Sequence, residues 1–196
     1  MRSHGSAGHP GGAFRQPAAG RGVGGVADDD GMDITVRTAR PEEYPELGEL
    51  VARAYLSGGL LDLGEADPYL ETLRDAAGRA GHAELLVAEG DRGELLGTVT
   101  FVGRGGPFAE RARQDEGEFR MLGVRESARG RGVGEALVTA CSDRARALGL
   151  SGLVLSTQPT MHAAHRLYRR LGFRRDAGRD WSPVPGVTLW AYALRL

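Results

Sequence analysis

The stretch RGRGVG at residues 129–134 decides the fold that the sequence predicts. An apolar-leaning, strand-like run at residues 118–124 precedes it, and an amphipathic helical pattern from about residue 132 to 149 follows it. Three glycines at alternate positions leave one edge of the turn bare, so unpaired N–H groups of the first helical turn can approach a ligand. The helix dipole adds roughly half a positive charge there, and two arginines add full charges. These features predict a phosphate-binding turn; the alternative is a glycine-rich connector with two solvated arginines.

The spacing of the glycines excludes two common phosphate-binding motifs. A dinucleotide fingerprint, G-x-G-x-x-G counted from Gly130, requires glycine at the position of Glu135. A P-loop requires a Gly-Lys pair, and the chain has none.

The stretch instead resembles the R/Q-x-x-G-x-G/A turn of the GNAT acetyltransferase superfamily, as Arg129-x-x-Gly132-x-Gly134. A second signature follows at the expected distance, because AHRLYRRLGF at residues 164–173 resembles the A-x-x-L-Y-x-x-L-G-F helix of that superfamily. The two motifs occur in the family's order and are separated by a strand. The resemblance extends over residues 34–196.

Composition limits the class of protein. The net charge of −1 gives no reason to expect nucleic acid or an anionic membrane as a partner, and no apolar run approaches the ~18–20 residues that span a bilayer. The amino end lacks an apolar signal segment. The single cysteine, Cys141, excludes an internal disulfide and fits a reducing cytoplasm, where we expect the protein. No Cys/His cluster has metal-site spacing, so we expect no metal.

Two regions are expected along the chain. Residues 1–32 are rich in Gly, Ala and Pro, and we expect a disordered tail there. Because Met32 directly precedes the first strand-like run, a start codon assigned too far upstream is a hypothesis that mass spectrometry of the native amino terminus would test. We expect residues 33–196 to form one N-acetyltransferase domain.

Strand and helix patterns alternate in the second region, which predicts an α/β architecture with a mixed sheet. Strands are expected at residues 34–37, 83–89, 94–102, 118–124, 153–156 and 187–196. Helices are expected at residues 41–56, where Ser57-Gly58-Gly59 breaks the pattern, and at residues 67–80, 132–149 and 161–171. The resemblance implies a mostly antiparallel sheet flanked by about four helices.

In the resembled family the ligand is acetyl-CoA, whose pyrophosphate lies on the glycine turn. Its pantetheine arm pairs with the fourth strand, where the fourth and fifth strands separate. Carried over to this sequence, the pantetheine-binding backbone belongs to Leu122, Gly123 and Val124. The pyrophosphate-binding residues are Arg129, Gly130, Arg131, Gly132, Val133 and Gly134.

Tyr168 is the catalytic candidate that the second motif implies, in the role of general acid. A thiol with a pKa near 8.5 is a modest leaving group, and a phenol with a pKa near 10 can protonate it as the C–S bond breaks. The alternative is a core tyrosine, because residues 164, 167, 168 and 171 share one helix face.

Glu118 is the candidate base, at a place where members of the resembled family often carry glutamate. A lysine-like amine with a pKa near 10.4 is nucleophilic only when neutral, which costs about 4–5 kcal/mol at pH 7. A carboxylate can accept that proton directly or through water. Glu116 is a weaker candidate, and a solvated strand end is the alternative for both.

Three other residues bear on the site. Cys141 lies on the apolar stripe of its helix, so we expect inert packing rather than an acyl-cysteine route. Met161 stands where the family usually carries an Asn that helps to hold the cofactor, and Gln158 or His162 are its possible substitutes. His162 and His165 are expected at the surface.

The acceptor is expected to be a primary amine on a small molecule or a peptide. Acidic residues in segments 57–67 and 103–117 favour a cationic amine, but Arg104, Arg111 and Arg113 weaken that indication. Small amines, amino acids, antibiotics and protein termini stay open. Trp181 lines the acceptor pocket or caps the core. A homodimer is common in the resembled family.

Three functions follow from these observations. The first is direct acetyl transfer from acetyl-CoA to an amine in a ternary complex. The alternative is a non-catalytic acyl-CoA-binding or sensing module on the same fold. An adaptor that uses the arginines of residues 166–175 is a third, which the near-neutral charge disfavours.

Overall fold

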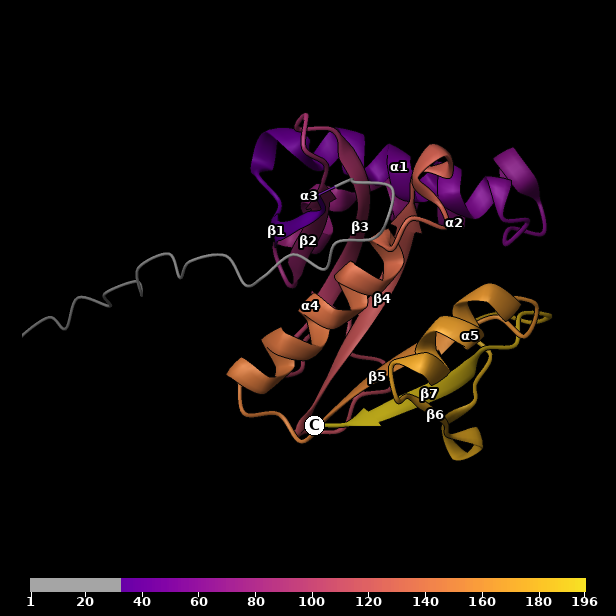
Figure 1. Cartoon of the computed structure of the whole chain (residues 1–196). Helices are drawn as coiled ribbons and strands as arrows, with labels where there is room; N and C mark the ends of the chain where they lie inside the picture. The colour runs from indigo at the N-terminus through magenta and orange to yellow at the C-terminus, as the bar shows by residue number, and fades with distance from the viewer. Residues whose placement is uncertain (1–32) are drawn as a thin grey trace, which may run out of the picture.

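The computed structural model describes residues 33–196 (Figure 1). The expectations of a disordered tail and of a misplaced start therefore lie outside the described residues.

A seven-stranded mixed sheet forms the centre of the fold, in the order β1-β2-β3-β4-β5-β7-β6. β4 and β5 are parallel, and every other pair of neighbours is antiparallel, which confirms the predicted mixed and mostly antiparallel sheet. The strands are β1 Thr35–Thr38, β2 Glu84–Glu89, β3 Leu95–Val102, β4 Glu116–Val124, β5 Gly152–Thr157, β6 Arg174–Arg175 and β7 Trp190–Arg195. β4 thus begins two residues earlier than predicted.

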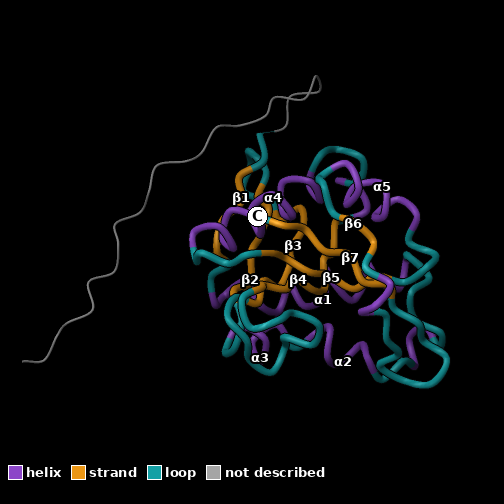
Figure 2. The backbone as a smooth tube through the Cα atoms, turned by 90° about the horizontal axis from the view of Figure 1, so that it is seen from below, coloured by secondary structure: helices purple, strands orange, loops and turns teal. Residues whose placement is uncertain are grey.

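Within residues 33–196, five α-helices cover the two faces of the sheet (Figure 2). One face carries α1 Tyr44–Ser57, α2 Tyr69–Arg74 and α3 Ala76–Ala80, and the other carries α4 Val133–Ala147 and α5 His162–Arg170. Four 3-10 turns complete the described elements: η1 Pro41–Glu43, η2 Gly64–Ala66, η3 Glu126–Ala128 and η4 Ala177–Arg179. The largest apolar cluster lies between the sheet and α4 and α5, and two smaller clusters lie under α1 to α3.

The predicted second helix, residues 67–80, is wrong in its continuity. The backbone leaves the helical conformation at Asp75, whose φ is −75° and ψ 64°, and the chain forms α2 and α3 instead. The Asp75 carboxylate accepts the N–H of Gly78 at 2.8 Å and caps α3. Because a short aspartate side chain competes for backbone N–H groups, it starts a new helix here.

The predicted apolar stripe of α4 is largely confirmed. Val133, Leu137 and Cys141 are fully buried against the sheet. The spacing also predicts Leu148 on this stripe, but the helix ends at Ala147 and Leu148 is 43% exposed. No helix within residues 33–196 is long and apolar enough to cross a membrane.

Candidate active site

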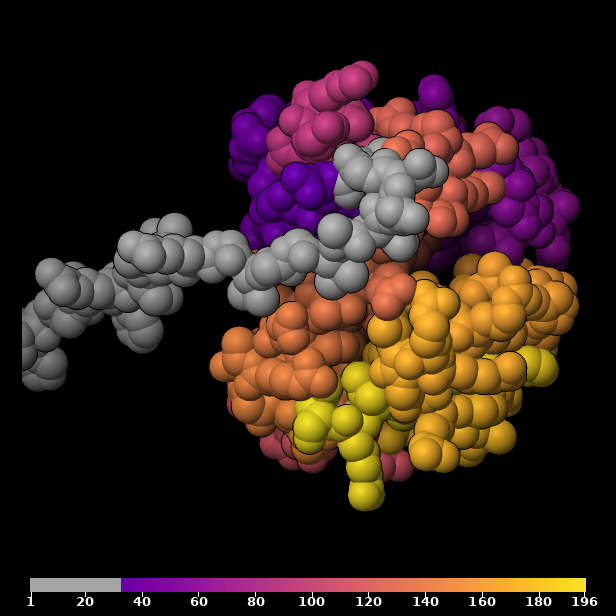
Figure 3. Space-filling view, viewed as in Figure 1, coloured from indigo at the N-terminus to yellow at the C-terminus, as the bar shows by residue number. Residues whose placement is uncertain are grey.

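The central feature of the site is an opening in the sheet between β4 and β5. The two strands pair only from Glu116 opposite Gly152 to Phe119 opposite Leu155. Beyond these pairs, β4 continues to Val124 and β5 to Thr157 without pairing with each other, and the strands diverge (Figure 1). The space-filling view shows a crease between α5 and the elements above it, on the same side of the molecule (Figure 3).

A β-bulge in β4 lies just beyond the last β4–β5 pair. Thr98 of β3 lies opposite Gly123 and Thr100 lies opposite Arg120, so β4 has one residue more than β3 in this interval. Met121 takes a φ of 51°, which is uncommon for a residue other than glycine. Because a bulge bends and twists its strand, it turns β4 away from β5 at this point.

The open edge of β4 presents unpaired backbone groups. The Arg125 N–H donates to the Leu96 carbonyl of β3 at 2.8 Å. Backbone polar groups of successive strand residues point to opposite edges, so those of Val124 and Leu122 face the opening. Gly123 faces β3, and its missing side chain lets α1 approach, since a Cβ would lie 3.1 Å from the Val51 Cα.

The glycine turn begins α4 and has the conformation that only glycine adopts readily. Gly130 and Gly132 have φ values of 76° and 82°, and Gly132 is the N-cap of the helix. The N–H groups of residues 131–135 donate no hydrogen bond to any residue within 33–196. Unpaired N–H groups and the positive helix end make this turn a site that favours anions.

The two arginines of the turn lie at the surface. Arg129 donates from Nη2 to the Ser57 Oγ at 2.6 Å and so joins the turn to the end of α1. A groove of about 400 Å³ runs beside it, between α1 and the connection from β4 to α4. Arg131 is exposed. Both guanidinium groups add positive charge to the turn, as the sequence predicts.

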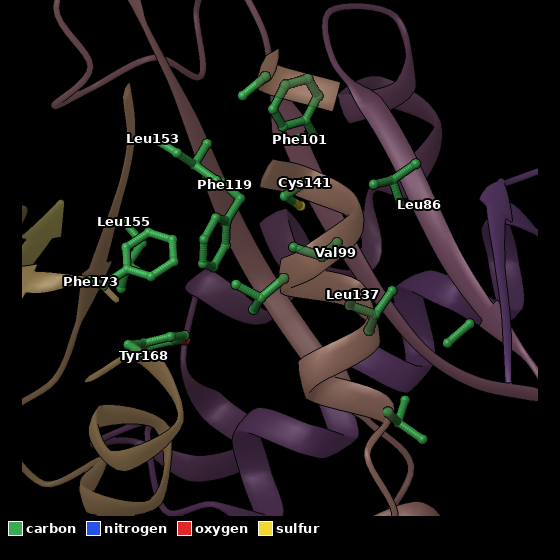
Figure 4. Close-up of a cluster of buried hydrophobic side chains, with 14 of the residues drawn as sticks. Leu86, Val99, Phe101, Phe119, Leu137, Cys141, Leu153, Leu155, Tyr168 and Phe173 are labelled. Carbon is green, nitrogen blue, oxygen red and sulfur yellow. The ribbon is translucent and has the colours of Figure 1, made fainter. Parts of the chain in front are cut away.

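Tyr168 lies at the apex of the opening, on the α5 side of the sheet. Tyr168 is 4% exposed. The centre of its ring lies 5.9 Å from that of Phe119, the last residue of β4 that pairs with β5, and 6.0 Å from that of Phe173. Its hydroxyl points away from Phe173 (Figure 4) and makes no hydrogen bond to another residue within 33–196. Burial raises the pKa of Tyr168 well above the ordinary value of a phenol.

Glu118 occupies the opposite face of β4, because successive strand residues point to opposite faces. Only 1% of it is exposed, so it is not a solvated strand end. Its Oε2 accepts backbone N–H groups of Glu110, Arg111 and Ala112 at 2.8–3.0 Å. Burial raises the pKa of Glu118, and these hydrogen bonds oppose the rise. Tyr168 and Glu118 therefore flank the opening from two sides.

Glu116 has a different environment. Its carboxylate makes two hydrogen bonds with the Arg179 guanidinium, at 2.5 and 2.9 Å, and also accepts the Arg113 N–H. Burial acts against the charge, but these partners hold the pKa of Glu116 below its usual value. An ionised carboxylate held this way joins the loop before β4 to the turn before β7.

His165 is a neighbour of the site that the sequence prediction placed wrongly at the surface. It is 3% exposed, and its ring stacks with those of Trp190 and Tyr192, at centre-to-centre distances of 5.5 and 5.3 Å. Its Nε2 lies 3.1 Å from the Gln158 carbonyl. The signal in the sequence is its position three residues before Tyr168, which puts both on one helix face.

The residues around Met161 hold the end of β5 in place. The Met161 sulfur accepts the Thr157 hydroxyl at 3.2 Å, and the Gln158 amide donates to the Leu60 carbonyl at 2.8 Å. Gln158 therefore ties β5 to the segment between α1 and α2. Cys141 is fully buried, and burial raises the pKa of its thiol, which fits inert packing. Among residues 33–196, no cluster of His, Cys, Asp and Glu could hold a metal ion.

Several known proteins with similar sequences are named as acetyltransferases. An uncharacterised N-acetyltransferase of Schizosaccharomyces pombe is 34% identical over 106 residues, which are 54% of this chain and 61% of that protein. The L-methionine sulfoximine/L-methionine sulfone acetyltransferase of Pseudomonas paraeruginosa is 37% identical over 99 residues, 50% of this chain and 55% of that protein. The matches thus span less than two thirds of the length of these relatives.

Solved structures share the fold. The Salmonella typhimurium protein yncA, solved with its cofactor acetyl-CoA, superposes with a TM-score of 0.63 at 20% identity, over 84% of this chain and 94% of that one. A GCN5-related N-acetyltransferase from Kribbella flavida gives a TM-score of 0.63 at 22% identity, over 83% and 98%. A sequence model of the acetyltransferase (GNAT) family matches residues 45–173, which is well over half of the chain. The chain therefore belongs to the acetyltransferase (GNAT) family.

Proposed function

We propose that this protein is an N-acetyltransferase that moves an acetyl group from acetyl-CoA directly to a primary amine in a ternary complex. One observation carries the proposal: the opening between β4 and β5 leads to a glycine turn with unpaired N–H groups. An elongated ligand with amides at one end and a diphosphate at the other fits this combination of groups.

The residues of the chain offer acetyl-CoA two kinds of contact. The backbone of Leu122 and Val124 faces the opening and would pair with the pantetheine amides, and Gly123 between them keeps β4 close to α1. The turn would hold the pyrophosphate through the backbone of Gly130, Gly132, Val133 and Gly134 and the charges of Arg129 and Arg131. Acetyl-CoA, when bound, supplies the activated acetyl group.

Tyr168 would act as the general acid. Its ring packs against Phe119 at the apex of the opening, and its hydroxyl makes no hydrogen bond to another described residue. It would donate its proton to the departing sulfur as the C–S bond breaks. The raised pKa of the buried phenol keeps the proton on Tyr168 until negative charge develops on that sulfur.

Glu118 would act as the base. Its Oε2 is held by three N–H groups, which fixes the carboxylate, while Oε1 makes no hydrogen bond to the described residues. Oε1 would accept the proton that the amine loses, directly or through a water molecule. A carboxylate with a raised pKa is a better proton acceptor than an exposed glutamate.

A thiol-release assay tests this proposal. Purified protein is mixed with acetyl-CoA and a panel of amines, and free thiol and acetylated amine are both measured. We expect the two products in equal amounts with at least one amine. If acetyl-CoA binds in calorimetry but no amine releases thiol, the protein is a non-catalytic acyl-CoA-binding module.

A further inference from the structure

Two loops lie near Glu118 on its face of the sheet. Residues 103–115 approach from the β4 side, and the Glu118 carboxylate binds three of their N–H groups. The segment before β7 approaches from the β5 side, where the Trp181 Nε1 donates to the Ser156 Oγ at 3.1 Å. Ser156 is the first residue of β5 beyond the last β4–β5 pair, so both loops reach the opening.

The carboxylates of these segments are already engaged. Glu110 pairs with Arg120, and Asp115 accepts the Ser151 hydroxyl at 2.5 Å. Glu116 pairs with Arg179, and Glu118 binds backbone N–H groups through Oε2. The acidic composition of residues 103–117 therefore provides little unused negative charge for a cationic amine.

Arg111, in the loop of residues 103–115, carries a positive charge that no described carboxylate pairs with. Its guanidinium makes no hydrogen bond and no ion pair within residues 33–196, and its Nε is buried without a partner. The other six arginines of the described chain that are not exposed each bind a carboxylate or backbone carbonyls. They are Arg37, Arg74, Arg79, Arg120, Arg175 and Arg179.

The position of Arg111 is fixed from two directions. Its backbone N–H donates to the Glu118 Oε2 at 2.8 Å, and its Cζ lies 5.7 Å from the centre of the Trp181 ring. The guanidinium thus lies between the loop anchored on β4 and the tryptophan anchored on β5. A partly covered cation without an anion is costly, and an anionic ligand would remove that cost.

We propose that Arg111 binds an anionic group of the acceptor, so that the acceptor is an amine that also carries a carboxylate, as an α-amino acid does. This inference rests on the proposed acetyl transfer. The Arg111 terminal nitrogens provide two parallel N–H donors that match a carboxylate. Arg111 is then a residue that determines specificity, while Tyr168 and Glu118 handle the protons.

Matched acceptors test the proposal. Each of several α-amino acids is compared with its carboxamide, which keeps the side chain and the amine but lacks the negative charge. We expect kcat/KM to be at least about tenfold higher for the amino acid, mainly through KM. In Arg111→Gln this preference disappears, and Arg111→Lys restores part of it. Arg113 is an exposed arginine of the same loop, and the control variant Arg113→Gln should keep the wild-type preference.

A second measurement separates this inference from the proposed function. Melting temperatures of the protein saturated with CoA are recorded with each amino acid and each carboxamide. We expect a larger rise with the amino acid than with its carboxamide, and loss of that difference in Arg111→Gln. Two results would overturn the role of Arg111. One is an equal kcat/KM of the wild type for the amino acid and its carboxamide, and the other is an equal loss of kcat/KM for both acceptors in Arg111→Gln. Absence of thiol release with every acceptor would instead remove the proposed function, and the melting shifts would still decide whether Arg111 recognises a carboxylate.

Discussion

At Glu118 burial and hydrogen bonding act in opposite directions on one carboxylate. Burial raises its pKa, and three N–H groups on Oε2 limit the rise. The same side chain therefore anchors residues 110–112 and keeps a basic oxygen beside the opening. The resemblance to the family made Glu118 the candidate base, a role that stays a prediction. The burial of Glu118 was not predictable, because backbone N–H groups of a loop leave no pattern in the sequence.

Glu118→Gln separates the structural role from the catalytic one. The amide oxygen of glutamine can still accept the loop N–H groups, but the amide is not a base. We expect kcat to fall by about 10²-fold while the melting temperature stays near the wild-type value. In the wild type, kcat/KM should rise with pH through a pKa above the ordinary glutamate value, and this limb should be absent in the variant. Wild-type turnover in Glu118→Gln would leave only the anchoring role.

Tyr168→Phe tests the proposed role of Tyr168 as the general acid. The change removes one hydroxyl from a ring that packs against Phe119 and Phe173, so packing is retained. We expect kcat to fall by about 10²-fold or more, with little change in the affinity for CoA measured by calorimetry. Tyr192→Phe is the matched control, because this buried tyrosine lies 6.1 Å away and its hydroxyl accepts a hydrogen bond from Arg169. Equal activity of Tyr168→Phe and Tyr192→Phe would contradict the assignment.

At the scale of single elements, β4 is irregular at the point where the sheet opens. The bulge at Met121 ends its pairing with β5, and Gly123 lets α1 lie close to the strand. The hydrophobic pattern predicted the strand itself. It could not predict the bulge, because an inserted residue is set by pairing with β3 and by packing of Met121 under α1 and α2.

Gly123→Ala tests the close contact of β4 with α1. The new Cβ would lie 3.1 Å from the Val51 Cα and 3.3 Å from the Ala54 Cβ, so the helix must move. We expect a loss of about 1–3 kcal/mol in the free energy of unfolding, measured by denaturant titration. Gly81→Ala is the control, since its φ is −67° and the nearest atom is 3.4 Å away. A destabilisation no larger than that of Gly81→Ala would show that the contact is not tight.

The junction of η1 with β1 gives a pH-dependent prediction. A hydrogen bond from Arg37 lowers the pKa of Glu43 to about 2, against the effect of burial, with help from the Arg40 N–H. Because the pKa of Glu43 is lower in the folded state, its ionisation stabilises the fold. This contribution to the free energy of unfolding is complete above pH ~4.5 and is lost as the pH falls through about 2. We expect Glu43→Gln to lose on the order of 2 kcal/mol near pH 6, and the loss to become small as the pH falls to about 2.

Thermal unfolding measured across this pH range checks the prediction. Glu42→Gln, in the same turn but exposed, is the control. A stability difference between Glu43→Gln and the wild type that did not change with pH would contradict the assignment to ionisation.

At the scale of the whole molecule, four residue pairs between β4 and β5 join two parts of the sheet. One part carries β1 to β4 and the other carries β5 to β7, and the opening lies between them (Figure 1). A ligand that pairs with β4 and contacts the start of α4 would stabilise the fold at this junction. At 100 times its Kd, acetyl-CoA should stabilise the fold by about 2.7 kcal/mol, which corresponds to a rise of about 5–10 °C in Tm.

The order of strands and helices was predictable because each element carries its own periodicity, and the two motifs located the turn and Tyr168. The break between α2 and α3 at Asp75 was not predictable. The apolar spacing continues through it, and the hydrogen bond from the Gly78 N–H to the Asp75 side chain decides the conformation. The unpaired state of Arg111 was not predictable either. It follows from ion pairs such as Glu116–Arg179, which join segments far apart in the sequence.

The central claim is that the bare turn at the start of α4 binds the diphosphate of acetyl-CoA. The most direct measurement is isothermal titration calorimetry of acetyl-CoA into the wild type, Gly132→Val and Gly149→Val. Gly149 also has a positive φ, 65°, but lies beyond the other end of α4, so it controls for backbone strain. We predict one binding site in the wild type, at least tenfold weaker binding in Gly132→Val, and wild-type affinity in Gly149→Val. No heat with well-folded wild type, or equal affinity in Gly132→Val, would contradict the claim.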